Sequence, residues 1–287
     1  MAEVAVVTDS TVCLPGDLVR EYGITIVPLR FELEGKSYRD GIDITAEDIY
    51  RYLPAARTLP TTSAPSPSDY YAAIAQAATR HSSVLVITVS RRLSAMLHSA
   101  MTAAATARDS LGHVRIRVLD SGTAAGAQGL VVLEAARAAA AGAYLDDVAN
   151  VARDTMSRVE LIAFLDTLYY LAKGGRVPMA LHWANSFIRV NPLFRIAPMS
   201  GEARTVRVAR GRHSAMRKLV ELVGEGIGSC KMYGIVFHSY SRDEAQHLST
   251  VLRGTFDCAE LHISDFTPAM GIHTGIGVVG LAYLTRQ

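Results

Sequence analysis

The sequence predicts an α/β protein of two domains, and three observations lead to that prediction. The chain has 287 residues, of which 49% are hydrophobic and 20% charged, so it holds enough apolar material for two cores. Its first half alternates strand-like apolar runs with helix-like segments, which indicates a parallel sheet flanked by helices. After about residue 143, hairpins are mixed with helices, which indicates a mixed sheet. We therefore expect an N-terminal α/β domain over residues 1–150 and a C-terminal α/β domain with a mixed sheet over residues 151–287.

In the first half, turn and capping signals separate the apolar runs. Thr45 and Ser66 each stand three residues before an aspartate, as N-cap residues of helices do, and Pro67 suits a first helical position. Glu34 and Gly35 join two short runs as a hairpin turn. The expected strands cover residues 4–7, 24–27, 30–33, 36–39, 84–89 and 114–119. The expected helices cover residues 14–23, 46–53, 66–80, a stretch that starts at Ser94, and the alanine-rich run 130–145.

In the second half, strand-like runs follow one another through short turns as well as through helices. Ser200 and Gly201 form such a turn, and Gly174 with Gly175 interrupts a helix-like segment. The expected strands cover residues 159–164, 189–196, 203–208, 233–237, 260–263 and 278–284. The expected helices cover residues 143–158, 213–223 and 243–253.

The composition argues against several classes of function. A net charge of +2, and aromatic residues that are not interleaved with basic ones, predict no nucleic-acid partner. Cys13, Cys230 and Cys258 are odd in number and lack CxxC spacing, so we expect no disulfide framework, no zinc site and a reducing, cytoplasmic location. The nine histidines show no metal-ligand spacing, so we expect no metal. The alanine-rich run carries Glu134 and Arg137, and the N-terminal residues lack a basic region, so we expect neither a membrane span nor a signal peptide.

A glycine pattern near the C-terminus matches a dinucleotide fingerprint in letters but not in context. Gly275, Gly277 and Gly280 satisfy GxGxxG, but a true fingerprint follows a strand, opens a helix and leads to a further strand. Seven residues remain after Gly280, which is too few for that arrangement. We therefore expect no nicotinamide cofactor, and no other motif predicts a cofactor.

Three polar segments, far apart in the sequence, carry candidate binding residues. Residues 271–277 offer the imidazole of His273 on glycine-rich backbone that a ligand can approach closely. Thr62 lies in a proline-flanked loop, and Ser94 follows an apolar run and opens a helix, whose N-terminus attracts anions. Further candidates beside them are Ser63 and Thr274. Neutral donors that converge in this way would suit a carboxylate.

Each of these residues also has an ordinary structural explanation. Ser94 can cap its helix, since a serine hydroxyl satisfies N–H groups of the first helical turn. Thr62 can hydrogen-bond the backbone of its own loop. His273 can be a buried histidine whose ring nitrogens are satisfied by neighbouring polar groups. The residue types alone leave both explanations open for all three.

Six short motifs in a fixed order resemble the DegV family. They span the chain, and their order makes the resemblance specific although no single motif is diagnostic. The motifs are Val7-Thr8-Asp9-Ser10-Thr11, Tyr38-Arg39-Asp40-Gly41, residues 60–67 (PTTSAPSP), Leu93-Ser94 with Ser99-Ala100, Leu165-Asp166-Thr167-Leu168 with Lys173-Gly174-Gly175-Arg176, and Gly271-Ile272-His273-Thr274-Gly275. The resemblance implies a two-domain α/β protein that holds one long-chain fatty acid between its domains. It also implies a fatty-acid-binding subunit of bacterial fatty acid kinase, without catalytic residues of its own, because a separate kinase subunit makes acyl phosphate from ATP.

The resemblance assigns roles to particular residues of this chain. The carboxylate-binding positions of the family fall on Thr62, Ser94 and His273, which are the three polar residues singled out above. The positions linked to kinase docking fall on Arg176 and Arg210. The chain departs from the common family pattern at Ala64, Arg91, Arg92, Ala95 and Ile276. Two of these departures, the arginines, stand close to Ser94 and would either strengthen anion binding or occlude the site, which bears on the identity of the ligand.

We expect the acyl chain to be lined by apolar residues of the second domain. The candidates are Phe164, Leu165, Leu168, Trp183, Phe187, Ile188 and Met270, each of which is also explained as ordinary core. Two alternative functions are a lipid hydrolase or acyltransferase, with Ser94 as nucleophile and His273 as base, and a lipid-sensing regulatory protein without a kinase partner. A carboxylate that orients His273 would favour the enzyme. We expect the protein to be a monomer.

Overall fold

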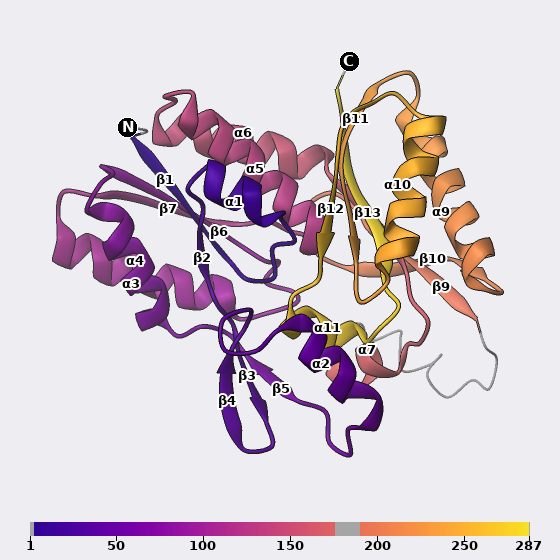
Figure 1. Ribbon diagram of the computed structural model, residues 1–287. Coiled ribbons are helices and arrows are strands. Elements are labelled where there is room, and N and C mark those ends of the chain that lie inside the picture. Colours follow the sequence, from indigo (N-terminus) through magenta and orange to yellow (C-terminus); the bar gives the residue numbers. More distant parts are fainter. Residues whose placement is uncertain (1–2, 176–189, 287) are drawn as a thin grey trace.

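The structure is a computed structural model that describes residues 3–175 and 190–286, and it contains three sheets (Figure 1). The first is a parallel sheet of order β2-β1-β6-β7. Its strands are β1 (Val4–Asp9), β2 (Thr25–Val27), β6 (Ser83–Thr88) and β7 (Arg115–Asp120). The helices of this half are α1 (Gly16–Glu21), α3 (Pro67–Ala78), α4 (Met96–Leu111), α5 (Ala125–Ala140) and α6 (Leu145–Arg158). Helices α3 and α4 cover one face of the sheet, and α5 and α6 cover the other.

The second sheet is mixed and has the order β10-β9-β8-β13-β11-β12, with a parallel pair at β11 and β12 and antiparallel pairs elsewhere. Its strands are β8 (Glu160–Phe164), β9 (Asn191–Ile196), β10 (Ala203–Ala209), β11 (Lys231–His238), β12 (Cys258–Asp265) and β13 (Val279–Arg286). Helices α9 (Arg212–Ile227) and α10 (Arg242–Thr255) cover one face, and α5 contacts strands of the other. The predicted fold class, a parallel sheet with helices followed by a mixed sheet with helices, is confirmed.

A small antiparallel sheet of order β4-β3-β5 extends from the body of the molecule. Its strands are β3 (Arg30–Leu33), β4 (Lys36–Arg39) and β5 (Thr61–Ser63). Beside it lie α2 (Ala46–Tyr52), the 3-10 helix η1 (Leu53–Ala55), α7 (Tyr169–Gly174) and α11 (Pro268–Thr274). This corner of the molecule joins segments from both halves of the chain, because α11 contacts α2, α7 and β5.

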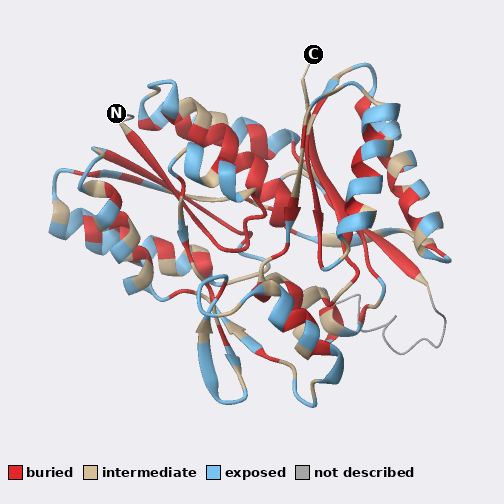
Figure 2. Cartoon of the chain, in the orientation of Figure 1, coloured by how far each residue is buried: buried red, intermediate tan, exposed pale blue. Residues whose placement is uncertain are grey.

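Helix α5 occupies a central layer between the two large sheets. It contacts β1 of the parallel sheet and β11 and β13 of the mixed sheet, and it is buried over most of its length (Figure 2). Because both of its long faces meet a sheet, its small residues are explained by packing: a side chain at Gly129 would lie 2.9 Å from the carbonyl oxygen of Cys13. The largest cluster of buried apolar side chains surrounds this helix, and a second lies between the mixed sheet and α9 and α10. The proposed boundary at residue 150 falls within α6.

Two local predictions differ from the structure, and one segment for which no element was predicted is helical. The segment Thr61–Ser63, expected as a loop, forms β5, because it pairs in register with β3, Phe31 opposite Thr62. Ser94 does not open a helix: α4 begins at Met96 with Ala95 at its N-cap, and Ser94 lies at the end of a turn after β6. The glycine-rich segment near the C-terminus is helical as far as Thr274, within α11.

Candidate functional site

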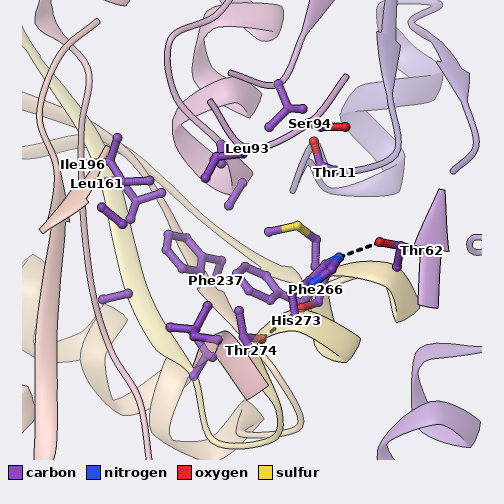
Figure 3. A pocket seen from close by; sticks show the side chains of 18 of the residues that line it. Thr11, Thr62, Leu93, Ser94, Leu161, Ile196, Phe237, Phe266, His273 and Thr274 are labelled. Atoms are coloured by element: carbon purple, nitrogen blue, oxygen red, sulfur yellow. Dashed lines mark hydrogen bonds between the residues drawn. The ribbon is translucent and has the colours of Figure 1, made fainter. Parts of the chain in front are cut away.

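A cavity lies between the carboxyl ends of β1 and β6 and one face of the mixed sheet (Figure 3). The chain leaves β1 for β2 on one side and later returns to β6 on the other, so the strand order reverses between β1 and β6. Loops diverge at such a point and leave room for a ligand. The cavity volume is about 170 Å³, whereas one water molecule needs roughly 10–15 Å³ of the same measure. This space is therefore large enough for an extended organic ligand.

One wall of the cavity is apolar because strand β8 alternates. Leu161, Ala163 and Leu165 line the cavity, whereas Ile162 and Phe164 point to the opposite face and belong to the core under α9 and α10. The neighbouring strands and loops complete this wall with Leu93, Phe194, Ile196, Phe237, Phe266, Met270 and Val278. The wall has few polar atoms, so it suits a hydrocarbon rather than a polar ligand.

The ring of Phe237 fits into this wall only because residue 280 is glycine. A Cβ atom at Gly280 would lie 2.4 Å from Phe237 Cζ and 2.7 Å from Ala163 Cβ. Heavy atoms do not approach so closely, so any larger residue at 280 would push the ring aside. The shape of the apolar wall thus depends on a residue that does not itself line it.

The other end of the cavity carries polar side chains from four separate segments. Thr62 Oγ1 on β5 lies 2.7 Å from Nε2 of His273 on α11, and both side chains are half-buried. Ser94 and Thr11 line the same cavity, and Figure 3 shows them across from the Thr62–His273 pair. Among the residues that the structure describes, Ser94 Oγ makes no hydrogen bond. Its hydroxyl is therefore available to a ligand.

The additional candidates Ser63 and Thr274 also line the cavity, but their hydroxyls are turned to the backbone. Ser63 Oγ donates to the carbonyl of Arg30 at 3.4 Å, and Thr274 Oγ1 donates to that of Met270 at 3.0 Å. The structure thus brings all five predicted polar residues to one cavity, although Thr62 and His273 are 211 positions apart in the sequence.

Helix α11, which carries His273, is held at its start by a buried carboxylate. Asp40 Oδ1 accepts a hydrogen bond from the backbone N–H of Ala269 at 2.8 Å, and Asp40 Oδ2 accepts one from Ser10 Oγ at 2.6 Å. Burial raises the pKa of Asp40, and these two hydrogen bonds oppose that rise. Because Ser10 follows β1, Asp40 ties the position of His273 to the parallel sheet. The sequence motif around Asp40 indicated no role for this residue. Its hydrogen bond to the first turn of α11 shows that it anchors that helix.

A second buried carboxyl, Asp9, lies behind Thr11. Thr11 Oγ1 lies 2.5 Å from Asp9 Oδ1 and 2.8 Å from Gln128 Oε1, but a hydroxyl has one proton to donate. Gln128 Nε2 donates to Thr8 Oγ1 at 3.1 Å, and Thr8 donates to the carbonyl of Ile87 at 2.8 Å. The backbone N–H groups of Thr11 and Val89 also donate to Asp9, at 3.1 Å to Oδ1 and at 2.8 Å to Oδ2. Burial is the largest influence and raises the pKa of Asp9, and the hydrogen bonds from Thr11, Val89 and Gln128 oppose that rise.

The two arginines near Ser94 point away from the cavity. Arg91 Nε lies 3.6 Å from Asp120, Arg92 Nη1 lies 3.9 Å from Glu202, and both side chains are exposed. Neither lines the cavity. In this structure they therefore neither occlude the site nor contribute a charge to it directly.

Among the predicted docking residues, Arg210 lies in the described part of the chain and is exposed at the end of β10. Two positions later, Arg212 is engaged: it pairs with Asp166, donates to Glu244 Oε1 at 2.6 Å and donates to the carbonyl of Gly277 at 2.9 Å. Asp166 is therefore explained as the partner of Arg212. Arg176 lies outside the described residues.

The predicted acyl-chain residues divide into three groups. Leu165 and Met270 line the cavity. Leu168 is buried but does not line the cavity. Phe164 lies on the far face of the mixed sheet, where the guanidinium carbon of Arg212 is 5.2 Å from the centroid of its ring. Trp183, Phe187 and Ile188 lie outside the described residues. Alternation along β8 contained the signal for Leu161 and Ala163, which sequence reasoning missed.

In the described ranges 3–175 and 190–286, no group of three or more His, Cys, Asp or Glu side chains is placed to hold a metal ion. Within the same ranges, no helix is long and apolar enough to cross a membrane.

Comparison with known families decides the relationship that the motifs indicated. A family model described as "Uncharacterised protein, DegV family" matches residues 3–286. The chain belongs to the DegV family. A DegV domain-containing protein of Clostridium perfringens is 31% identical over 281 residues, which cover 98% of each chain.

Solved structures of DegV proteins share the fold. A DegV family protein of Thermus thermophilus, described as fatty-acid binding, superposes with a TM-score of 0.90 at 26% identity, covering 99% of this chain and 100% of its own. DegV of Bacillus subtilis, described as a fatty acid binding protein, gives a TM-score of 0.86 at 25% identity and covers 100% of both chains.

Proposed function

We propose that this DegV protein binds one long-chain fatty acid in the cavity between its two large sheets. The observation that carries the proposal is the polarity of the cavity: donors of Thr62, Ser94 and His273 lie at one end, and the apolar face of the mixed sheet lies at the other. An amphiphile with a small polar head and a long tail matches this distribution. The described fatty-acid binding of the Thermus and Bacillus proteins supports the same ligand class.

The tail supplies most of the affinity in this proposal. Burying roughly 14 methylenes at about 0.8 kcal/mol each gives on the order of 11 kcal/mol of transfer free energy, from which the cost of ordering the chain is subtracted. The head group supplies orientation. Neutral donors hold the carboxylate without a salt bridge, so its oxygen keeps the electron density that a nucleophile needs.

We further propose that the bound acid is presented to a separate fatty acid kinase. In that reaction a carboxylate oxygen attacks the γ-phosphorus of ATP, the bond from that phosphorus to the β–γ bridging oxygen breaks, and acyl phosphate and ADP form. The half-burial of Thr62 and His273 supports this role, because the head group then lies near the protein surface. Arg176 and Arg210 are the proposed docking residues.

The two alternative functions make different demands. A hydrolase or acyltransferase with Ser94 as nucleophile needs Ser94 within hydrogen-bond reach of His273, whereas Nε2 lies 2.7 Å from Thr62 Oγ1. This contact favours a carrier. A lipid-sensing protein would bind the same acid but would not support acyl phosphate formation by any kinase.

Extraction of the purified recombinant protein with organic solvent, followed by mass spectrometry, tests the proposal. We expect one fatty acid of about 14 to 18 carbons per chain, the length that fits a tail of this transfer free energy. Native mass spectrometry of the same sample gives the stoichiometry. Recovery of no lipid, together with no binding of added palmitate or oleate, would refute the carrier function.

A further inference from the structure

A groove on the protein surface lies on the other side of the Thr62–His273 pair. Thr62 and His273 line both the cavity and this groove, so the pair forms the partition between them. The other walls come from the loop Arg57–Thr61, from α7 and from Ile272 of α11. Figure 1 shows β5, α7 and α11 gathered at this corner of the molecule. A group attached to a head group held by the partition would therefore enter the groove.

The lining of the groove is cationic. Arg57 and Lys173 both line it and are exposed, and none of the described residues that line it is an aspartate or glutamate. Neither cation forms an ion pair with any residue in the ranges 3–175 and 190–286. Lys173 Nζ lies 6.0 Å from the ring centroid of Tyr169, which also lines the groove. Two unneutralised cations beside a reacting carboxylate suit a doubly charged anion.

We propose that this groove is the subsite for the phosphoryl group of acyl phosphate, with Arg57 and Lys173 as its cationic ligands. Phosphorylation adds charge and three oxygens to the head group, and such a group is costly to place in the apolar cavity but not in a cationic groove. The hydroxyl groups of Thr58 and Thr61, which also line the groove, add hydrogen-bond donors. An acidic surface of a partner protein is less favoured as the occupant of the groove, because the groove shares Thr62 and His273 with the ligand cavity. This inference rests on the proposed fatty-acid binding and on the proposed kinase reaction that forms acyl phosphate.

The test compares two ligands that have the same tail and different head groups. One is palmitate. The other is the ketophosphonate analogue of palmitoyl phosphate, in which a methylene replaces the bridging oxygen and prevents hydrolysis. For the double variant Arg57→Gln with Lys173→Gln, titration should show about a tenfold weaker affinity for the ketophosphonate and a palmitate affinity within about twofold of the parent protein. Raised salt should shrink the difference between variant and parent.

A matched control loses the same charge elsewhere. Arg80 and Lys231 are exposed and line no groove wall described above, so Arg80→Gln with Lys231→Gln should leave both affinities unchanged. If the parent protein does not bind palmitate, the proposed function itself fails. If palmitate binds but both affinities fall together, or neither falls, the inference alone is wrong. The inference is also wrong if the variant slows kinase turnover while the ratio of its palmitate and ketophosphonate affinities equals that of the parent. The groove would then contact the partner protein instead of the phosphoryl group.

Discussion

The two ends of the cavity are built in different ways. The polar end takes one or two side chains from each of several segments: the turns after β1 and β6, strand β5 and helix α11. The apolar end is mainly one face of one sheet, whose strands present alternate side chains to it. Hydrogen bonds depend on direction and distance, whereas apolar contact depends on area. The polar end should therefore be sensitive to position, and the apolar end to volume.

The largest effect is expected from filling the apolar end. Ala163→Phe places an aromatic ring in the cavity and removes the room for about four methylenes, which corresponds to about 3 kcal/mol and more than a hundredfold in palmitate affinity. The affinity for laurate, whose tail is shorter, should fall far less. Titration of both acids measures the shift in chain-length preference. An equal loss for the two acids would mean that the tail does not occupy this end.

The opposite face of the same strand offers the control. Ile162 points to the core under α9 and α10, so Ile162→Val should lower the free energy of unfolding by about 0.5–1.5 kcal/mol. It should leave the affinity for both acids unchanged. Denaturant unfolding and the same titrations distinguish the two faces.

Polar substitutions should change head-group selection. Thr62→Val keeps the shape of the side chain but removes the hydroxyl that contacts His273 Nε2. The free energy of palmitate binding should weaken by about 1–3 kcal/mol, roughly 5- to 150-fold in affinity, because polar groups at this end of the cavity lose a hydrogen-bond partner. Ser94→Ala and His273→Ala should act similarly. Thermal unfolding should change little.

Hexadecanol, which has the same tail length and a neutral head, is the comparison ligand. Its affinity should change less than that of palmitate in each of these variants, and Thr62→Ser should recover part of the palmitate affinity. Unchanged palmitate binding in all three variants, with a loss on substitution of Arg91 and Arg92, would move the head-group site to those arginines.

The sequence could predict the parts of the fold that depend on local pattern. Both capping boxes, at Thr45 and Ser66, occur as expected, because a hydroxyl and an aspartate three residues apart satisfy each other within one turn. Strand β5 could not be predicted in the same way, since its three residues become a strand through pairing with β3. Helix α11 does have a local signal, because Thr267 at its N-cap is followed by Pro268 at the first helical position.

The candidate site depended more on distant contacts. The residue types and the family resemblance selected Thr62, Ser94 and His273, but no spacing in the sequence predicts that residues 211 positions apart are 2.7 Å apart. The apolar wall needed the strand order of the mixed sheet, because Phe237 and Ile196 lie on strands that are not adjacent in the sheet. Phe164 was selected for its apolar character, but its position in the strand sends it to the other face.

The two buried carboxyls behind the polar end should respond differently to substitution. Asp40→Ala removes the acceptor of the Ser10 hydroxyl proton and of the Ala269 N–H, so the free energy of unfolding should fall by about 1–3 kcal/mol. Palmitate affinity should fall as well, because α11 loses its anchor. Asp9→Asn keeps a neutral side chain and should leave the stability at pH 7 equal to that of the parent or higher by on the order of 1 kcal/mol.

The direction in which the free energy of unfolding changes with pH follows from the raised pKa of Asp9. A carboxyl whose folded pKa lies above its unfolded value, about 3.9, gives stability that is full below that value and is lost as the pH rises through the folded pKa. Asp9→Asn removes that loss. Urea unfolding between pH 4 and pH 8 should therefore show a smaller decline for the variant. An equal decline in both proteins would contradict the raised pKa of Asp9.

The smallest effect is expected outside the cavity altogether. Arg210 is exposed, does not line the cavity and forms no ion pair within residues 3–175 and 190–286. Arg210→Gln should leave palmitate affinity unchanged but slow acyl phosphate formation by the cognate kinase about three- to tenfold, because exposed charges mainly guide association. Raised salt should slow the parent protein towards the variant, and Arg210→Glu should be slower still. The same expectation holds for Arg176. A variant that loses lipid affinity and turnover in parallel would place its arginine in lipid binding or folding, and docking would then need other residues.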